Sequence, residues 1–212
     1  MLYKQYQNSR NAAWKVLNTH RVCKLPVRIS EICKADGITV RSYSQAGKLI
    51  DALGLAQSTI NNDGFAISIR GRDFIFFDDS CTVRRQRFTV AHEYGHFINN
   101  DVSSVPTCRN REPSENDDVI ETRANIVASR ILAPACVLWA LDIHSAEIIS
   151  DLCDISLAAA KWRLKRLETL YAREQEFRRT RRISCFLMHP DERTVYRRFL
   201  PYIEDLKSSG QF

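Results

Sequence analysis

The sequence predicts a mostly helical α+β fold in which a small β-sheet lies next to one helix. Helical patterns of apolar residues recur along most of the 212-residue chain. Alternating apolar residues, typical of strands, occur at residues 38–43 and 65–77. In the second segment Gly71 separates two apolar runs, which indicates a β-hairpin, and a helical pattern at residues 82–99 follows directly. The hairpin is therefore expected to pack against that helix.

The N-terminal half is expected to alternate helices with short strands. Gly37 and Gly54 each follow a helical pattern and are expected to end it, and Ser44 is expected to cap the N-terminus of the helix before Gly54. The expected elements are a helix at residues 3–18, a short helix from Pro26 to Cys33, a strand at 38–43, a helix at 44–53 and the hairpin at 65–77.

The C-terminal half is expected to be almost entirely helical after a loop at residues 100–115. Asp117 and Asp118 favour the N-terminus of the first helix, Pro134 is expected to break it, and Pro201 is expected to disturb the last one. The expected elements are helices at 117–132, 135–141, 145–152, 156–171 and 194–206, with a short strand at 183–188.

Composition restricts the class of protein. With 44% hydrophobic residues the chain can bury one sizeable core, and no apolar run is long enough to cross a membrane. Residues 1–21 are polar and lack the apolar stretch of a signal peptide, so we expect a cytoplasmic protein. The scattered cysteines, without a Cys-x-x-Cys pair, are expected to be small buried hydrophobes in a reducing compartment. They are Cys23, Cys33, Cys81, Cys108, Cys136, Cys153 and Cys185.

The net charge of +6 is concentrated in residues 161–182. Two interpretations stay open: a solvated helix face, or a surface that binds nucleic acid or an acidic partner. The basic residues are Lys161, Arg163, Lys165, Arg166, Arg173, Arg178, Arg179, Arg181 and Arg182.

Residues 92–96 read His-Glu-Tyr-Gly-His, the most informative pattern in the chain. Histidines four positions apart on a helix leave the same face one turn apart, so His92 and His96 can reach one ion at the distance of about 2 Å that zinc prefers. Glu93, next to the first histidine, can act as a general base toward an attacking water. The alternative is a helix with two partly buried histidines and a surface glutamate.

Two histidines hold zinc weakly unless a third protein ligand joins them. His20, His144 and His189 lie far away in sequence, so a carboxylate on the following helix is favoured, and Glu121 opens that helix. Asn125, one turn later, is expected to hydrogen-bond a ligand from behind. Zinc is the expected ion, although two histidines and a carboxylate also accept iron or manganese.

Two blocks together resemble the ImmA/IrrE metallopeptidases: residues 87–96, and Glu121-x-x-Ala124-Asn125 continued through Pro134. The resemblance extends to Leu25-Pro26-Val27, Gly37-Ile38, Asp63-Gly64-Phe65 and residues 152–163. It implies a compact zincin-like (gluzincin-type) metallopeptidase fold. We expect a metallopeptidase domain at residues 1–142, followed by a helical, basic region at 143–212 that is either separate or part of the same domain. Tyr94 stands where an aliphatic residue is usual, and residues after about 171 have no firm counterpart.

The resemblance also implies a function. His92, His96 and Glu121 match the family's zinc ligands and Glu93 its catalytic glutamate. The expected activity is zinc-dependent endoproteolysis of a cytoplasmic helix-turn-helix repressor of a mobile element or stress response. The alternative is a DNA- or protein-binding module whose metal site is sensory or structural, with residues 145–170 as a helix-turn-helix.

Further expectations concern the surroundings of the metal. The hairpin is expected to pack on the helix at residues 82–99, called the metal helix because it carries His92 and His96. The hairpin is also expected to offer a strand edge to an extended substrate. Gly95 is expected to let the sheet backbone or the substrate come close, and Tyr94 is expected to serve packing or the rim. His144 and Arg123 are candidate donors to the oxyanion that forms during hydrolysis.

Overall fold

The computed structural model of the chain describes residues 3–55, 62–102, 119–181 and 184–210. Its backbone divides into two compact units, one of residues 1–9 and 28–128 and the other of residues 10–27 and 129–212. The expected α+β architecture, mostly helical with a small sheet, is confirmed. The functional division between residues 142 and 143 stays a prediction.

The sheet of the first unit has three strands in the order β1-β3-β2 (β1 Thr39–Ser42, β2 Gly64–Ile69, β3 Arg72–Phe77). β2 and β3 form the predicted antiparallel hairpin, in which Ala66 pairs with Ile75, and β1 joins β3 in parallel. Successive side chains of a strand point to opposite faces. The sheet therefore presents one apolar layer to each side.

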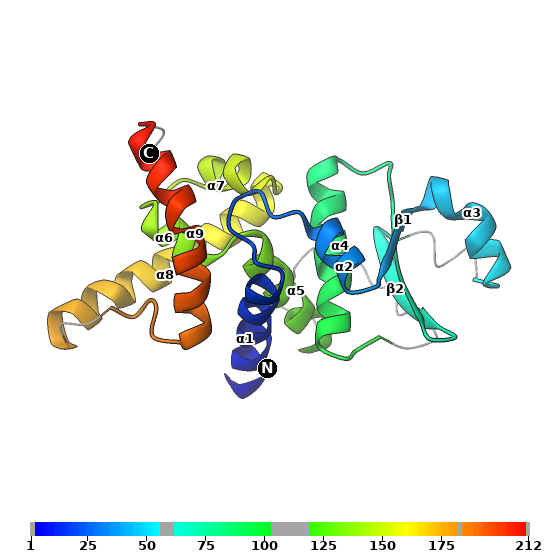
Figure 1. Cartoon of the computed structure of the whole chain (residues 1–212), viewed down its shortest axis with the longest axis horizontal. Helices are drawn as coiled ribbons and strands as arrows, with labels where there is room; N and C mark the ends of the chain where they lie inside the picture. The colour runs from blue at the N-terminus through cyan, green and yellow to red at the C-terminus, as the bar shows by residue number, and fades with distance from the viewer. Residues whose placement is uncertain (1–2, 56–61, 103–118, 182–183, 211–212) are drawn as a thin grey trace. The chain divides into compact units, whose positions relative to one another are not determined.

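The two faces of the sheet are covered by different helices (Figure 1). On one face, Phe65, Ile67, Phe74 and Phe76 pack with Ala46 and Ile50 of α3 (Tyr43–Ala52). On the other face lies α4 (Val83–Ile98), which contacts β2 and β3, and α2 (Ile29–Ala35) packs against α4 and β1. The expected packing of the hairpin on the metal helix is confirmed.

Both ends of α4 are fixed by local hydrogen bonds, close to the expected bounds of 82–99. The Thr82 side chain accepts from the backbone N–H of Arg85, as an N-cap does. At the other end Asn100 is left-handed (φ 58°), and the N–H of Asp101 reaches back to the carbonyl of His96. This is a Schellman turn, for which asparagine is a suitable residue.

The predicted N-cap of α3 was wrong. Ser42, not Ser44, caps α3, because the last residue of β1 turns directly into the helix and its side chain accepts from the N–H of Gln45. Ser44 instead lies in the first turn and bonds Asp79.

The second unit is helical. It contains most of α1 (Tyr3–Thr19) and the end of α5 (Val119–Leu132). Its remaining helices are α6 (Ala135–Ala140), α7 (Ala146–Cys153), α8 (Leu157–Arg181) and α9 (Pro190–Ser208). No helix in the described ranges is long and apolar enough to cross a membrane.

Helix α8 continues to Arg181, well beyond the expected end near Tyr171, and the described residues 184–188 form bends rather than the expected strand. The buried carboxylate of Glu174 links the last turns of α8 to this segment. It accepts hydrogen bonds from Arg178, one turn later in the helix, and from the Ser184 hydroxyl and the Cys185 N–H. The N–H groups of Phe186 and Leu187 likewise donate to side chains, those of Ser184 and Glu192, so these backbone donors are satisfied without a partner strand.

The described cysteines are free thiols. The expected burial is confirmed for Cys33, Cys136 and Cys153 but was wrong for Cys23, which is exposed, and for Cys81 and Cys185, which are half-buried. Cys108 lies outside the described residues. Burial raises the pKa of the Cys33 thiol to about 12, so it stays protonated and behaves as a small apolar group.

Candidate metal centre

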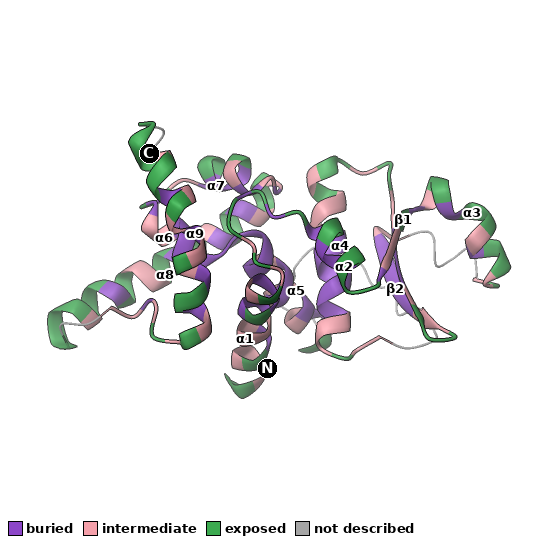
Figure 2. Ribbon diagram, viewed as in Figure 1, coloured by how far each residue is buried: buried purple, intermediate pink, exposed green. Residues whose placement is uncertain are grey.

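His92 and His96 converge from one face of α4. Their Nε2 atoms lie 3.1 Å apart, as the four-residue spacing predicts. The side chains are almost completely covered, with 1% of His92 and 9% of His96 exposed. Figure 2 shows that α4 is buried along the middle of its length. Both imidazoles therefore lie in a water-poor environment, where a lone pair is a strong ligand for a cation.

Glu121, in the first turn of α5, joins the histidine pair. Its Oε2 lies 3.1 Å from Nε2 of His92, and its Oε1 lies 3.7 Å from Nε2 of His96. The residue is 8% exposed. The expected first residues of this helix, Asp117 and Asp118, and most of the expected loop before it lie outside the described residues.

The close approach of α4 and α5 depends on Gly95. A Cβ atom at this position would lie 2.8 Å from the carbonyl oxygen and 3.0 Å from the Cα of Ala124. The expectation that Gly95 admits the sheet or the substrate was wrong, because the backbone of α5 occupies that space. The small pair Gly95–Ala124 lets Glu121 reach the histidines.

The three side chains fit a shared metal ion. Their ligand atoms all lie within 4.8 Å of one another. Two ligands about 2 Å from one ion in tetrahedral geometry lie about 3.3 Å apart. The separations of 3.1 to 3.7 Å between these atoms scatter around that value.

Hydrogen bonding to Asn125 provides a second test of the fit. Its Oδ1 lies 2.8 Å from Nδ1 of His92, which confirms the contact expected from the sequence. An amide oxygen accepts, so the ring proton belongs on Nδ1 and the lone pair of Nε2 faces the carboxylate of Glu121. Two such acceptors at 3.1 Å repel each other unless a cation or a further proton lies between them.

Glu93 follows His92 on α4 and is 1% exposed. Adjacent residues of a helix diverge by about 100°. Glu93 is accordingly absent from the set of converging ligand atoms. A carboxylate buried beside such a set is suited to exchanging protons with a reactant.

Other candidates are engaged elsewhere. Tyr94 is 1% exposed, and its hydroxyl donates to Asp36 at 2.6 Å, so its expected packing role is confirmed. Arg123 contacts Asp101 and donates to the carbonyl of Asn99. His144, exposed in the second unit, bonds Asp142. Neither candidate oxyanion donor has a contact with the three converging ligand atoms among the interactions described.

Asp101, which was not among the predicted site residues, also lies beside the histidines. Its Oδ2 lies 4.0 Å from Nδ1 of His96, on the side of the ring opposite the converging Nε2 atoms. The signal was present in Asn99-Asn100-Asp101, because an asparagine after a helix favours the left-handed turn that brings the next residue back toward the last turn.

Comparisons with known proteins identify the family. No curated protein matches the chain in a sequence search. The model of the Peptidase_M78 family, described as the IrrE N-terminal-like domain, matches residues 33–166, more than half of the chain. The matched region contains α4, α5 and all the residues that converge between them. The chain therefore belongs to this metallopeptidase family, as its resemblance to ImmA/IrrE proteins predicted.

Proposed function

We propose that the chain is a zinc-dependent endopeptidase whose substrate is a cytoplasmic protein, a helix-turn-helix repressor of a mobile element or stress response. Family membership supports the peptidase class. The substrate is inferred from the resemblance to ImmA/IrrE proteins. The observation that carries the proposal is the buried convergence of His92, His96 and Glu121.

In the proposed site His92, His96 and Glu121 would hold the ion. Two imidazoles and one carboxylate form a donor set typical of catalytic zinc. When bound, zinc supplies a Lewis acid that polarises the scissile carbonyl and makes a water more acidic. Asn125 keeps the proton of His92 on Nδ1, so that Nε2 is available as a ligand.

Glu93 carries the proton transfers. Its carboxylate accepts a proton from the attacking water and then delivers it to the nitrogen of the leaving amine. Because Glu93 and His92 are neighbours on one rigid helix, the base is held at a fixed distance from the ligands. The burial of Glu93 limits proton exchange with bulk water.

The sheet offers a place for the substrate backbone. In the order β1-β3-β2, strand β2 is an edge of the sheet that the described residues form, and it lies on α4, the helix that carries the histidines. An extended segment that added to this edge would be fixed by main-chain hydrogen bonds, independently of its side chains. We propose that the substrate binds there as an additional strand.

Metal content is the first test. We expect about one zinc per wild-type chain and much less in Glu121→Ala, measured by elemental analysis after identical purification. Glu168→Ala is the matched control, because it removes the same carboxylate from an exposed position of α8. A wild-type protein without metal, or a Glu121→Ala variant that binds as much as the control, contradicts the assignment.

Proteolysis is the second test, with Glu93→Gln as the variant. It keeps the shape of the side chain but cannot accept a proton, so we expect full metal content and no cleavage. Wild type and variant should be co-expressed with candidate helix-turn-helix repressors and the repressor fragments followed by immunoblotting. Undiminished cleavage by the variant removes Glu93 from the mechanism.

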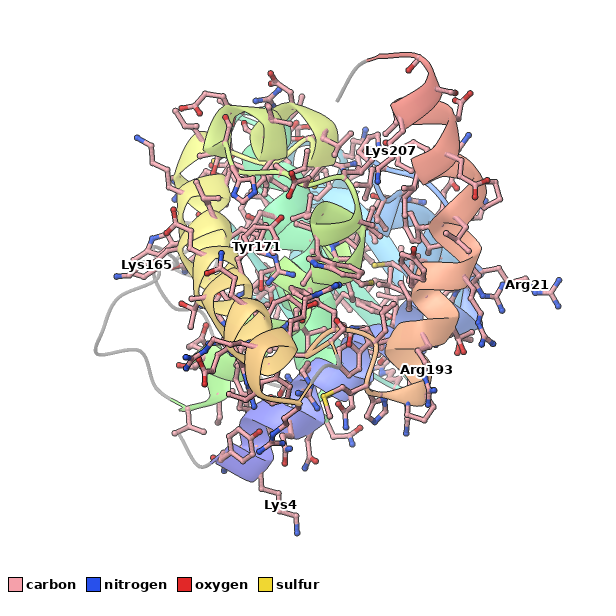
Figure 3. The ribbon with its side chains drawn as sticks, turned by 90° about the vertical axis from the view of Figure 1, so that its left-hand side faces the viewer. Lys4, Arg21, Lys165, Tyr171, Arg193 and Lys207 are labelled. Carbon is pink, nitrogen blue, oxygen red and sulfur yellow. The ribbon has the colours of Figure 1, made fainter. Side chains whose placement is uncertain are left out.

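A DNA- or protein-binding module is the second candidate. Helices α7 and α8 are joined by a short turn, and Lys165 extends from α8 into solvent (Figure 3). However, Arg163 is 4% exposed and donates to the carbonyl of Ala133, and Arg179 pairs with Glu176. These engagements favour the peptidase. Salt-dependent retention on nucleic acid would support the module if it disappeared on neutralising Arg178, Arg179, Arg181 and Arg182.

A further inference from the structure

We propose that Asp101 and Arg123 form a positioning pair for His96, the second histidine of the metal centre. The inference rests on the proposed metal site, because its consequence is the strength with which that site holds zinc. Neither residue belongs to the set of converging ligand atoms. Both would act through His96.

The geometry of the imidazole ring gives such a partner a role. His96 presents Nε2 to His92 and Glu121, so Nε2 is its ligand atom and the ring proton must sit on Nδ1. Oδ2 of Asp101 lies 4.0 Å from Nδ1. A negative charge on that side favours the Nδ1–H tautomer, orients the ring and makes Nε2 a better donor.

The carboxylate is shielded from water. Its side chain is 10% exposed, and that of His96 is 11% exposed. Screening by solvent is weak at such positions, so a charge at this distance acts more strongly than at the surface. The Schellman turn at the end of α4 holds the backbone of Asp101 against the last turn of the helix, through its N–H to the carbonyl of His96.

Arg123 fixes the other side of this arrangement. Its Nη1 lies 3.5 Å from Oδ1 of Asp101, and its Nη2 donates to the carbonyl of Asn99 at 3.2 Å. Arg123 also follows Glu121 by two residues on α5. The guanidinium therefore ties the helix that carries Glu121 to the turn that carries Asp101, and keeps the ligands of both helices in register.

The two histidines are thus supported differently. Behind His92 stands the neutral amide of Asn125, whereas the group behind His96 is a charged carboxylate held by an arginine. Carboxylate support raises the basicity of a ligating imidazole more than an amide does.

Zinc affinity measured by competition with a chromophoric chelator tests the proposal. We expect Asp101→Asn to weaken binding by about tenfold or more, the usual effect of losing a partner behind a ligand, and Asp101→Glu to recover part of the loss. Asp142→Asn is the matched control, because Asp142 is likewise paired with a histidine: its Oδ1 lies 3.1 Å from Nε2 of His144, at the surface of the second unit. Its affinity should equal that of wild type.

Arg123→Gln separates positioning from charge. If the arginine acted only as a positive charge near a cation, its loss would tighten zinc binding. Positioning predicts weaker binding. It also predicts that the double variant Asp101→Asn, Arg123→Gln loses less affinity than the two single losses added together, because part of the arginine's effect runs through the aspartate. Tighter binding in Arg123→Gln, or losses of the two variants that simply add, overturns the proposal.

The ring proton of His96 provides a readout that a loss of general stability would not change. In the zinc-loaded protein Nε2 would be the ligand atom and Nδ1 would carry the proton, and the nitrogen-15 and proton shifts of that Nδ1–H group report its surroundings. We expect this signal to move and its exchange with water to become faster in Asp101→Asn, and neither to change in Asp142→Asn. Wild-type protein that binds no zinc refutes the proposed function. Zinc binding that is unaffected in all Asp101 variants refutes only the positioning role.

Discussion

Replacement of Gly95 by alanine tests how closely the two ligand-bearing helices must approach. The added Cβ would lie 2.8 Å from the carbonyl oxygen of Ala124, whereas ordinary contact begins at 3.4 Å. The obstacle is backbone on both sides, so α4 and α5 must separate by about half an ångström rather than rotate a side chain aside.

The expected magnitude combines two opposing effects. Overpacking a tight contact costs about 1–3 kcal/mol, and alanine in place of glycine inside a helix stabilises by about 1 kcal/mol. Gly95→Ala should therefore lower the free energy of unfolding by about 0–2 kcal/mol. Gly47→Ala is the matched control: it makes the same change inside α3, where nothing lies within 4 Å of the new Cβ. It should gain about 1 kcal/mol.

The assay is urea denaturation of both metal-free variants, followed by zinc competition with a chelator. Because Glu121 sits on α5 and the histidines on α4, separation of the helices displaces one ligand from the other two. A shift near 0.5 Å exceeds what a metal site tolerates, so we expect roughly tenfold weaker binding in Gly95→Ala and no change in Gly47→Ala. Equal stability and equal affinity of the two variants would refute the reasoning.

Three further predictions follow from the same structure. Tyr94→Phe removes the hydrogen bond to Asp36 and should cost about 1–2 kcal/mol in urea denaturation while leaving zinc affinity unchanged; a lost metal would mean that Tyr94 serves the site. Burial alone raises the pKa of Glu174, but its hydrogen bonds to Arg178 and neighbouring groups hold it below its ordinary value. The carboxylate of Glu174 therefore stabilises the fold above its ordinary pKa, and this stabilisation is lost as the pH falls through the lowered pKa. Glu174→Gln should lower the free energy of unfolding by about 1–2 kcal/mol at pH 7 and by less in acid. A loss that does not depend on pH contradicts this reasoning. Zinc at a hundredfold excess over its dissociation constant should stabilise wild type by about 2.7 kcal/mol, and a chelator should reverse the resulting rise in melting temperature.

Local patterns in the sequence predicted elements whose stabilising contacts are close in the chain. The hairpin and the helix from Thr82 to Asn99 were predicted because alternation, turn residues and capping side chains act over a few positions. The convergence of His92 and His96 has the same origin. Where the signal depended on distant contacts, the prediction failed, as for α8, whose extension accompanies the bonds that Glu174 makes to residues 184 and 185.

The sequence alone determined that His92 and His96 share one face of a helix and that Glu93 follows the first of them in the chain. The reason is that a helix repeats every 3.6 residues whatever surrounds it. Only the tertiary structure decided which groups meet that face. The contact of Gly95 with Ala124 sets the distance to Glu121, and the turn after α4 places Asp101 behind His96. These contacts depend on the packing of one helix on another, which is fixed by shape across segments far apart in the chain and leaves no periodic signal in the sequence.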